Sequence, residues 1–229
     1  MIEVAVRLPL ARLTRTRAWI IPAVWLAFAV TAAALLARAG GMQRGASVLE
    51  PWVGGVAIPF LAFAVVRAVL GGDGLAHATR PLTILGASPV RTAGALAAVG
   101  IAVSAVACGF AGLAAALATH GPADPPLAGD ALATTWVCAL GGAAYAALFV
   151  LGGAFGKHGG GRALAFGLDW VLGQEGTATA PVTPRAHLRS LLGGPAIESL
   201  PGRASALLLL VLAFAFALLA VVRARRPQS

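Results

Sequence analysis

Few side chains in this chain could do chemistry, and Asp169 is the most unusual of them. It lies beside Trp170 within the apolar stretch 162–173. An ionised carboxylate near the centre of a membrane helix costs about 2.5–3.5 kcal/mol on insertion scales, so it usually faces a bundle interior or water. Such a group could relay protons or contact a polar substrate.

A structural role for Asp169 is the alternative. Thr or Arg from a neighbouring helix could hydrogen-bond the carboxylate, or the carboxylate could lie near the end of a shallow helix. A proton-coupled carrier usually has more than one intramembrane carboxylate, and no second one lies inside a clear apolar span. The sequence therefore favours the structural role.

The other reactive side chains lack the spacing that metal or covalent chemistry needs. Cys108 and Cys138 lie inside apolar stretches and are expected to pack as small side chains. No Ser-His-Asp or paired-carboxylate arrangement indicates an intramembrane enzyme. The sequence predicts no metal site, because the four histidines fall in loops and do not pair at ligand spacing. These histidines are His77, His120, His158 and His187.

The stretch 152–157 is the nearest thing to a phosphate-binding loop. It has no Gly five residues before Gly156 and no Ser or Thr after Lys157, both of which the motif requires. It also ends an apolar span, with no strand before it. We therefore expect no ATP hydrolysis and no bound cofactor in this chain; if ATP is used, another chain supplies the site.

The elements that must position these side chains are membrane spans. Uncharged runs of 20, 32, 26 and 19 residues separate Arg17 from Arg38, Arg91 from Asp124, Asp130 from Lys157, and Arg203 from Arg223. A bilayer-spanning helix needs about 20 apolar residues. Only 11% of the residues are charged, less than half the usual share of a soluble domain.

The predicted fold is an all-α integral membrane protein with six transmembrane helices, forming one transmembrane domain over 1–229. The fifth helix is short, and at about 1.5 Å per residue it covers less than 20 Å. The predicted spans are about 18–37, 52–71, 92–118, 131–156, 162–173 and 204–222.

Charge distribution predicts the orientation. With six spans, one side holds both termini, 72–91 and 157–161, and carries twelve basic residues against five on the other side. The positive-inside rule then predicts a multi-pass protein of the cytoplasmic (inner) membrane with both termini in the cytoplasm. Basic residues gather at span ends, so the net charge of +9 indicates membrane lipids as partners and no nucleic acid.

The predicted cytoplasmic segment 72–91 contains a helix-compatible piece around 75–86, followed by a Ser88-Pro89 break. A short amphipathic helix lying along the membrane could dock a soluble partner. A plain connecting loop is the alternative, and composition alone favours it.

Three stretches carry a resemblance to a known family. The stretch 80–91, Arg-Pro-Leu-Thr-Ile-Leu-Gly-Ala-Ser-Pro-Val-Arg, resembles the cytoplasmic segment after the second span in permease subunits of type-2 (exporter-like) ABC transporters. The basic N-terminal stretch that leads through Arg17-Ala-Trp19 into a span is similar to the family's N-terminus. The stretch 183–193 resembles the segment before its final span.

This resemblance implies an unidentified substrate exported with the energy of ATP, which a separate ATPase subunit hydrolyses. It implies a second permease subunit, in a homodimer or heterodimer, and short extracellular helices in 174–203. It also implies a coupling segment that receives the motion of the ATPase, with Arg80 as an ion-pair partner. The coupling residues would be Leu75, Arg80, Leu82, Leu85, Ser88 and Pro89.

Three departures from the family pattern are the short fifth span, the sparse aromatic residues and the glycine-rich start of 72–91. Two other classes of function stay open. One is a non-transporting membrane scaffold or assembly protein, and the other is a stand-alone proton-coupled carrier that uses Asp169.

Overall fold

Helices account for every regular element among the described residues of this chain. The computed structural model describes residues 7, 17–40, 45–72, 74–156, 159–197 and 200–224, and no strand occurs among them. Lys157 and His158, discussed above, lie outside these residues. An apolar chain in lipid must satisfy its backbone hydrogen bonds internally, which favours helices. The prediction of an all-helical fold is confirmed.

Five helical stretches within the described residues are long and apolar enough to cross a membrane. They are η1 and α2 (Arg17–Trp19, Ile20–Ala39), the stretch Ala46–Ile84, α6 (Pro89–Thr119), α7 (Leu127–Gly152) and α10 (Gly202–Arg223). The stretch Ala46–Ile84 contains α3 (Ala46–Val48), η2 (Leu49–Ala57) and α4 (Ile58–Leu70), which form the second long helix, and then the short helix α5 (Leu75–Ile84). The four uncharged runs of the sequence coincide with four of these stretches, and the fifth corresponds to the predicted span 52–71, which Arg67 interrupts.

The remaining elements are short. The predicted fifth span forms α8 (Gly161–Leu172), whose 12 residues extend about 18 Å and fall short of a hydrocarbon core of about 30 Å. The other short elements are α5 (Leu75–Ile84), η4 (Ala180–Val182) and α9 (Pro184–Leu191).

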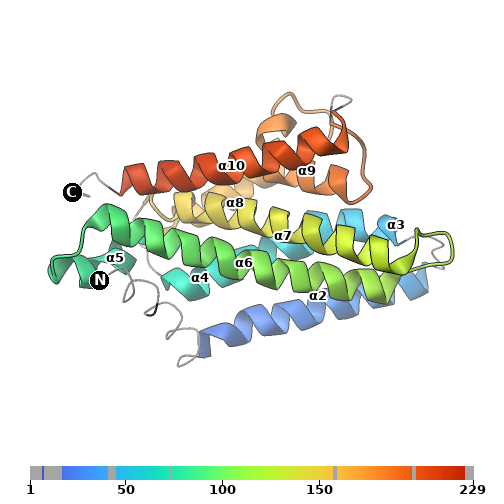
Figure 1. Cartoon of the computed structure of the whole chain (residues 1–229), viewed down its shortest axis with the longest axis horizontal. Coiled ribbons are helices and arrows are strands. Elements are labelled where there is room, and N and C mark those ends of the chain that lie inside the picture. Colours follow the sequence, from blue (N-terminus) through green and yellow to red (C-terminus); the bar gives the residue numbers. More distant parts are fainter. Residues whose placement is uncertain are drawn as a thin grey trace.

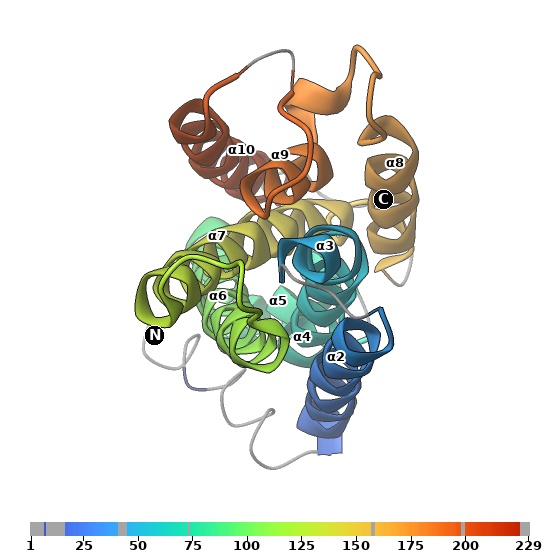
Figure 2. The ribbon, with the colours of Figure 1, turned by 90° about the vertical axis from the view of Figure 1, so that its right-hand side faces the viewer.

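The long helices lie along one axis and form a bundle (Figure 1). Viewed along that axis, α4, α6 and α7 lie centrally, with α2 and α10 on opposite sides (Figure 2). Helices α2 and α6 run from the end that holds α5 towards the end that holds α3. Helices α7 and α10 both run the other way, so the residues between them return along the bundle (Figure 1).

Helices α6 and α7 pack closely through a matched pair of small residues. Each helix carries a cysteine and, four residues later, a glycine: Cys108 and Gly112 on α6, Cys138 and Gly142 on α7. A Cβ added at Gly112 would lie 2.6 Å from the Cys138 Sγ, and one at Gly142 would lie 2.7 Å from the Cys108 Sγ. Both thiols are fully buried, so the prediction that they pack as small side chains is confirmed.

The second long helix begins earlier and more irregularly than the sequence predicts. The predicted span starts near residue 52, whereas the helix starts at Ala46 and winds as a π-helix over η2. Pro51 falls within this π-helical stretch, where it cannot donate a backbone hydrogen bond. The Trp52 indole donates to the Ala29 carbonyl of α2 (2.9 Å), and Trp25 donates to Ala57 (3.0 Å).

Candidate functional site

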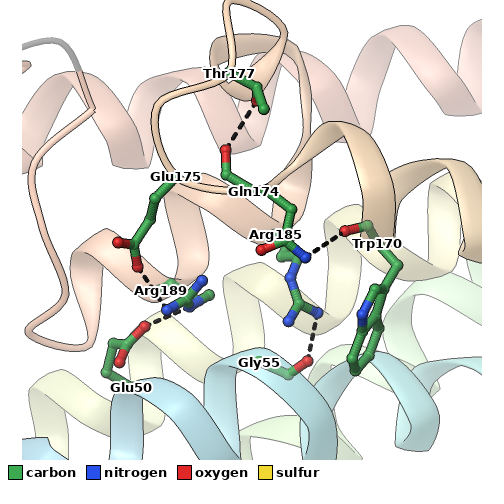
Figure 3. A network of polar contacts seen from close by, with 8 residues as sticks. All are labelled: Glu50, Gly55, Trp170, Gln174, Glu175, Thr177, Arg185 and Arg189. Atoms are coloured by element: carbon green, nitrogen blue, oxygen red, sulfur yellow. Dashed lines mark hydrogen bonds and ion pairs between the residues drawn. The ribbon is translucent and has the colours of Figure 1, made fainter.

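A chain of polar contacts joins α9 to the π-helical start of the second long helix. The Arg189 guanidinium bonds the carboxylate of Glu50 on η2 through Nε, and that of Glu175 through Nη2 at 2.7 Å. Figure 3 shows Arg189 between these two carboxylates. The side chains of Arg189 and Glu50 are only 17% and 14% exposed, so a large share of the ion pair is shielded from water.

Arg185 lies one helical turn before Arg189 and contacts the same π-helix. Its Nη1 donates to the Gly55 carbonyl at 2.6 Å, and its guanidinium carbon lies 3.9 Å from the centre of the Trp170 ring (Figure 3). A cation over an indole face is favourable, more so when desolvated. Burial lowers the pKa of Arg185 from its ordinary value, although a guanidinium keeps its charge in proteins.

Glycines let α9 approach its neighbours. A Cβ at Gly54 of η2 would lie 2.9 Å from the Leu192 side chain, and one at Gly141 of α7 would lie 2.7 Å from Leu188. Leu188 is fully buried. Helix α9 thus packs against both the second long helix and α7. Apolar contacts join it to both helices, and Arg185 and Arg189 bind it to the second long helix.

Asp169 adjoins this cluster and has partners for both of its oxygens. The hydroxyl of Tyr145, the only tyrosine of the chain, donates to Oδ2 at 2.8 Å, and the backbone N–H of Arg185 donates to Oδ1 at 3.3 Å. Asp169 as a whole residue is 6% exposed. A tyrosine and a backbone amide therefore provide the contacts that we expected from a Thr or Arg side chain.

Asp169→Leu is expected to lower the free energy of unfolding by about 1–3 kcal/mol, because the Tyr145 hydroxyl and the Arg185 amide would lose their acceptor inside the protein. Asp169→Asn keeps one carbonyl oxygen and should cost less. A thiol-reactive dye can measure melting, since Cys108 and Cys138 are buried in the folded protein. Equal melting temperatures for wild type and Asp169→Leu would contradict the structural role.

The predicted coupling segment forms a two-faced helix. Leu75, Ala78, Thr79 and Leu82 recur at helical spacing and are buried in α5, and the Leu75 N–H donates to Gly153 at the end of α7 (2.7 Å). The opposite surface is exposed. Of the predicted coupling residues, Leu75 and Leu82 therefore hold α5 on the bundle, and the other four are open to a partner: Arg80, Leu85, Ser88 and Pro89.

The α5 segment ends in an apolar, exposed turn. Ile84 is 74% exposed and Leu85 is 72% exposed. Gly86, with φ of +86°, adopts a left-handed conformation there that a glycine tolerates without strain. Ser88 precedes α6, Pro89 is its first residue, and this position suits a residue without a backbone N–H.

The prediction that all four histidines lie in loops is wrong for two of them. His77 is in α5 and His187 is in α9. The His187 ring lies 2.8 Å from the Pro181 carbonyl through Nε2, and burial lowers its pKa. His77 and His187 lie in short helices, which composition alone did not distinguish from loops.

His120 lies near two carboxylates in the turn between α6 and α7. Its Nδ1 is 4.0 Å from Asp124 and 3.9 Å from Asp130, a grouping that the histidine spacing alone did not predict. Asp124 accepts the backbone N–H groups of Gly45 and Gly121 (each 2.8 Å from Oδ2), so it caps this turn and fixes it to the start of the second helix.

Comparisons of the chain with protein-family models, with curated proteins and with solved structures find no match in any of the three. Function must therefore be argued from the two-faced α5 and from the polar cluster around α9.

Proposed function

We propose that this chain is the permease subunit of an ATP-driven ABC-type exporter, with six membrane crossings and both termini in the cytoplasm. A separate ATPase subunit hydrolyses ATP, and a second permease subunit completes the transport path. The observation that carries the proposal is α5, a short helix between two long ones, with a buried face on the bundle and an exposed apolar and basic face.

The exposed face of α5 has the composition of a docking site for a soluble protein. Ile84 and Leu85 offer apolar side chains, and Arg80 offers a cation beside them. Buried apolar and arginine contacts commonly supply much of the affinity of protein interfaces. The buried face transmits motion, because Leu75 is hydrogen-bonded to the end of α7 and α5 connects directly to α4 and α6.

The sixth crossing in this proposal is made by α8 and the residues around it. Helices α7 and α10 run in the same direction, so the chain between them must travel from one end of the bundle to the other. Residues 174–197 then lie at the extracellular end, with α9 packed against the bundle.

Arg80→Glu is expected to reduce co-purification of the ATPase subunit by about tenfold or more, because like charges facing each other at an interface cost several kcal/mol. The matched control is Arg38→Glu, an exposed arginine in the last turn of α2 at the other end of the bundle. The measurement is quantitative mass spectrometry of complexes purified from native membranes in mild detergent. A phosphate-loop ATPase retained equally by both variants would contradict α5 as the docking element.

A membrane scaffold and a proton-coupled carrier are the competing functions. The scaffold predicts no stoichiometric ATPase in such a purification. The carrier predicts transport without ATP that Asp169→Asn abolishes without changing the melting temperature. The hydrogen bonds to both oxygens of Asp169 favour the structural role over the carrier.

A further inference from the structure

A cavity of about 620 Å³ lies between α2, α4 and α5, away from the polar cluster around α9. Its volume is within the range of about 300–1,000 Å³ that is usual for small-molecule sites. The cavity is open on one side. Its walls are mainly apolar and include Trp25, Phe60, Phe63 and Ala64, and Arg67 also lines it.

One end of this cavity is cationic and glycine-rich. Arg67, in the last turn of α4, lines the cavity and is exposed. Gly71 and Gly72 follow at the end of the helix, and a Cβ built at Gly72 would have no atom within 4 Å. Arg67 and the unobstructed Gly72 therefore line the same cavity, where α4 ends and the chain continues into α5.

The other walls suit a hydrocarbon chain. Phe60 is 38% exposed and Ile21 is 65% exposed, although both are large apolar side chains that line the cavity. The Trp25 and Phe60 rings lie 5.1 Å apart and form one continuous aromatic wall between α2 and α4. These surfaces belong to helices of membrane-spanning length.

We infer that this cavity binds one anionic phospholipid, with an acyl chain against Trp25, Phe60 and Phe63 and the headgroup phosphate paired with Arg67. Guanidinium groups pair well with phosphate, in a geometry that can use two hydrogen bonds at once. An apolar wall that ends in a cation fits an amphiphilic anion better than a neutral lipid. This site and the proposed ATPase contact both involve α5 but use different residues, because Arg80 and Leu85 do not line the cavity.

Trp25 provides a built-in reporter for the test. The full-length protein is reconstituted into phosphatidylcholine vesicles that contain 10 mol% phosphatidylglycerol. In one set of vesicles the phosphatidylglycerol carries brominated acyl chains, which quench tryptophan fluorescence, and in the other set the phosphatidylcholine carries them. The Trp25 signal is the difference between wild type and Trp25→Phe. We expect quenching by brominated phosphatidylglycerol to exceed its share of the bilayer and to saturate at low mole fraction.

Arg67→Gln is expected to lower the preference for phosphatidylglycerol about fivefold, the effect of one basic side chain near an anionic headgroup. Arg38→Gln, at an exposed arginine on α2, should leave it unchanged. Ala64→Phe should fill the cavity and reduce quenching, whereas Ala133→Phe, at an exposed position of α7, should not. The amount of phosphatidylglycerol that co-purifies in detergent should follow the same order.

Three results would overturn the inference. An equal preference for phosphatidylglycerol in wild type and Arg67→Gln would show that Arg67 does not bind the headgroup. Quenching by each lipid in proportion to its mole fraction in the bilayer would show that the cavity does not select phosphatidylglycerol and is an ordinary lipid-facing surface. Absence of quenching by both lipids would show that protein covers the cavity, from this chain or from a second subunit.

Discussion

Arg189→Glu is expected to lower the melting temperature by about 6–20 °C. The substitution would place a third carboxylate between Glu50 and Glu175 and release α9 from the π-helix. Breaking a buried ion pair costs about 3–5 kcal/mol, and both members of the Glu50–Arg189 pair are largely shielded from water. The measurement is thermal exposure of Cys108 and Cys138 to a thiol-reactive dye in detergent.

A charge swap separates the ion pair from other effects of the substitution. Glu50→Arg combined with Arg189→Glu should recover part of the lost stability, because the two groups can pair in reverse. Arg203→Glu, at an exposed position near the start of α10, should melt close to wild type. Melting of Arg189→Glu within about 2 °C of wild type would show that the ion pair does not hold α9.

Gly142→Ala should destabilise the protein by about 1–3 kcal/mol, although it adds only one methyl group to a helix. The new Cβ would lie 2.5 Å from the Cys108 Cβ and 2.9 Å from the Ser104 carbonyl oxygen of α6. Cβ atoms in proteins essentially never lie this close to another heavy atom, so α6 and α7 would have to move apart. The same dye measurement applies, with Cys138 as a reporter.

Two matched variants sharpen this packing prediction. Gly142→Ala with Cys108→Gly should restore part of the stability, because the methyl group would occupy the space of the removed side chain. Gly167→Ala should be neutral or stabilising, since its Cβ would meet no atom within 4 Å and alanine favours helix by about 0.5–1 kcal/mol. If Gly142→Ala and Gly167→Ala melted alike, close packing of α6 on α7 would be contradicted.

The long helices could be predicted from the sequence because their signal is local. Absence of charge over about 20 residues is visible directly along the chain and located four of the five stretches of spanning length, while the apolar composition of 52–71 located the other despite Arg67. The exposed side of α5 was also predictable in part, since Arg80, Ser88 and Pro89 lie in a stretch of helix breakers and polar residues.

The site around α9 could not be predicted, because its partners are distant in sequence. Arg189 and Glu50 are separated by 139 residues, and Arg185 and Gly55 by 130. The four-residue spacing of Arg185 and Arg189 indicates one helical face, but nothing local identifies what that face meets. For Asp169, the single tyrosine was a signal that could have suggested a hydrogen-bond donor, since a buried tyrosine hydroxyl usually finds a partner.

The common direction of α7 and α10 has a consequence for the order in which the chain assembles. Helices α6 and α7 are joined by a short turn and can form as a hairpin while the chain is being synthesised. Helix α10 has no such hairpin partner, and its contact with α7 through Leu209, Leu140 and Ala144 must wait until α8 and α9 have been placed. Synthesis that stalls before residue 202 would leave that side of α7 without α10, an intermediate that membrane quality control could recognise.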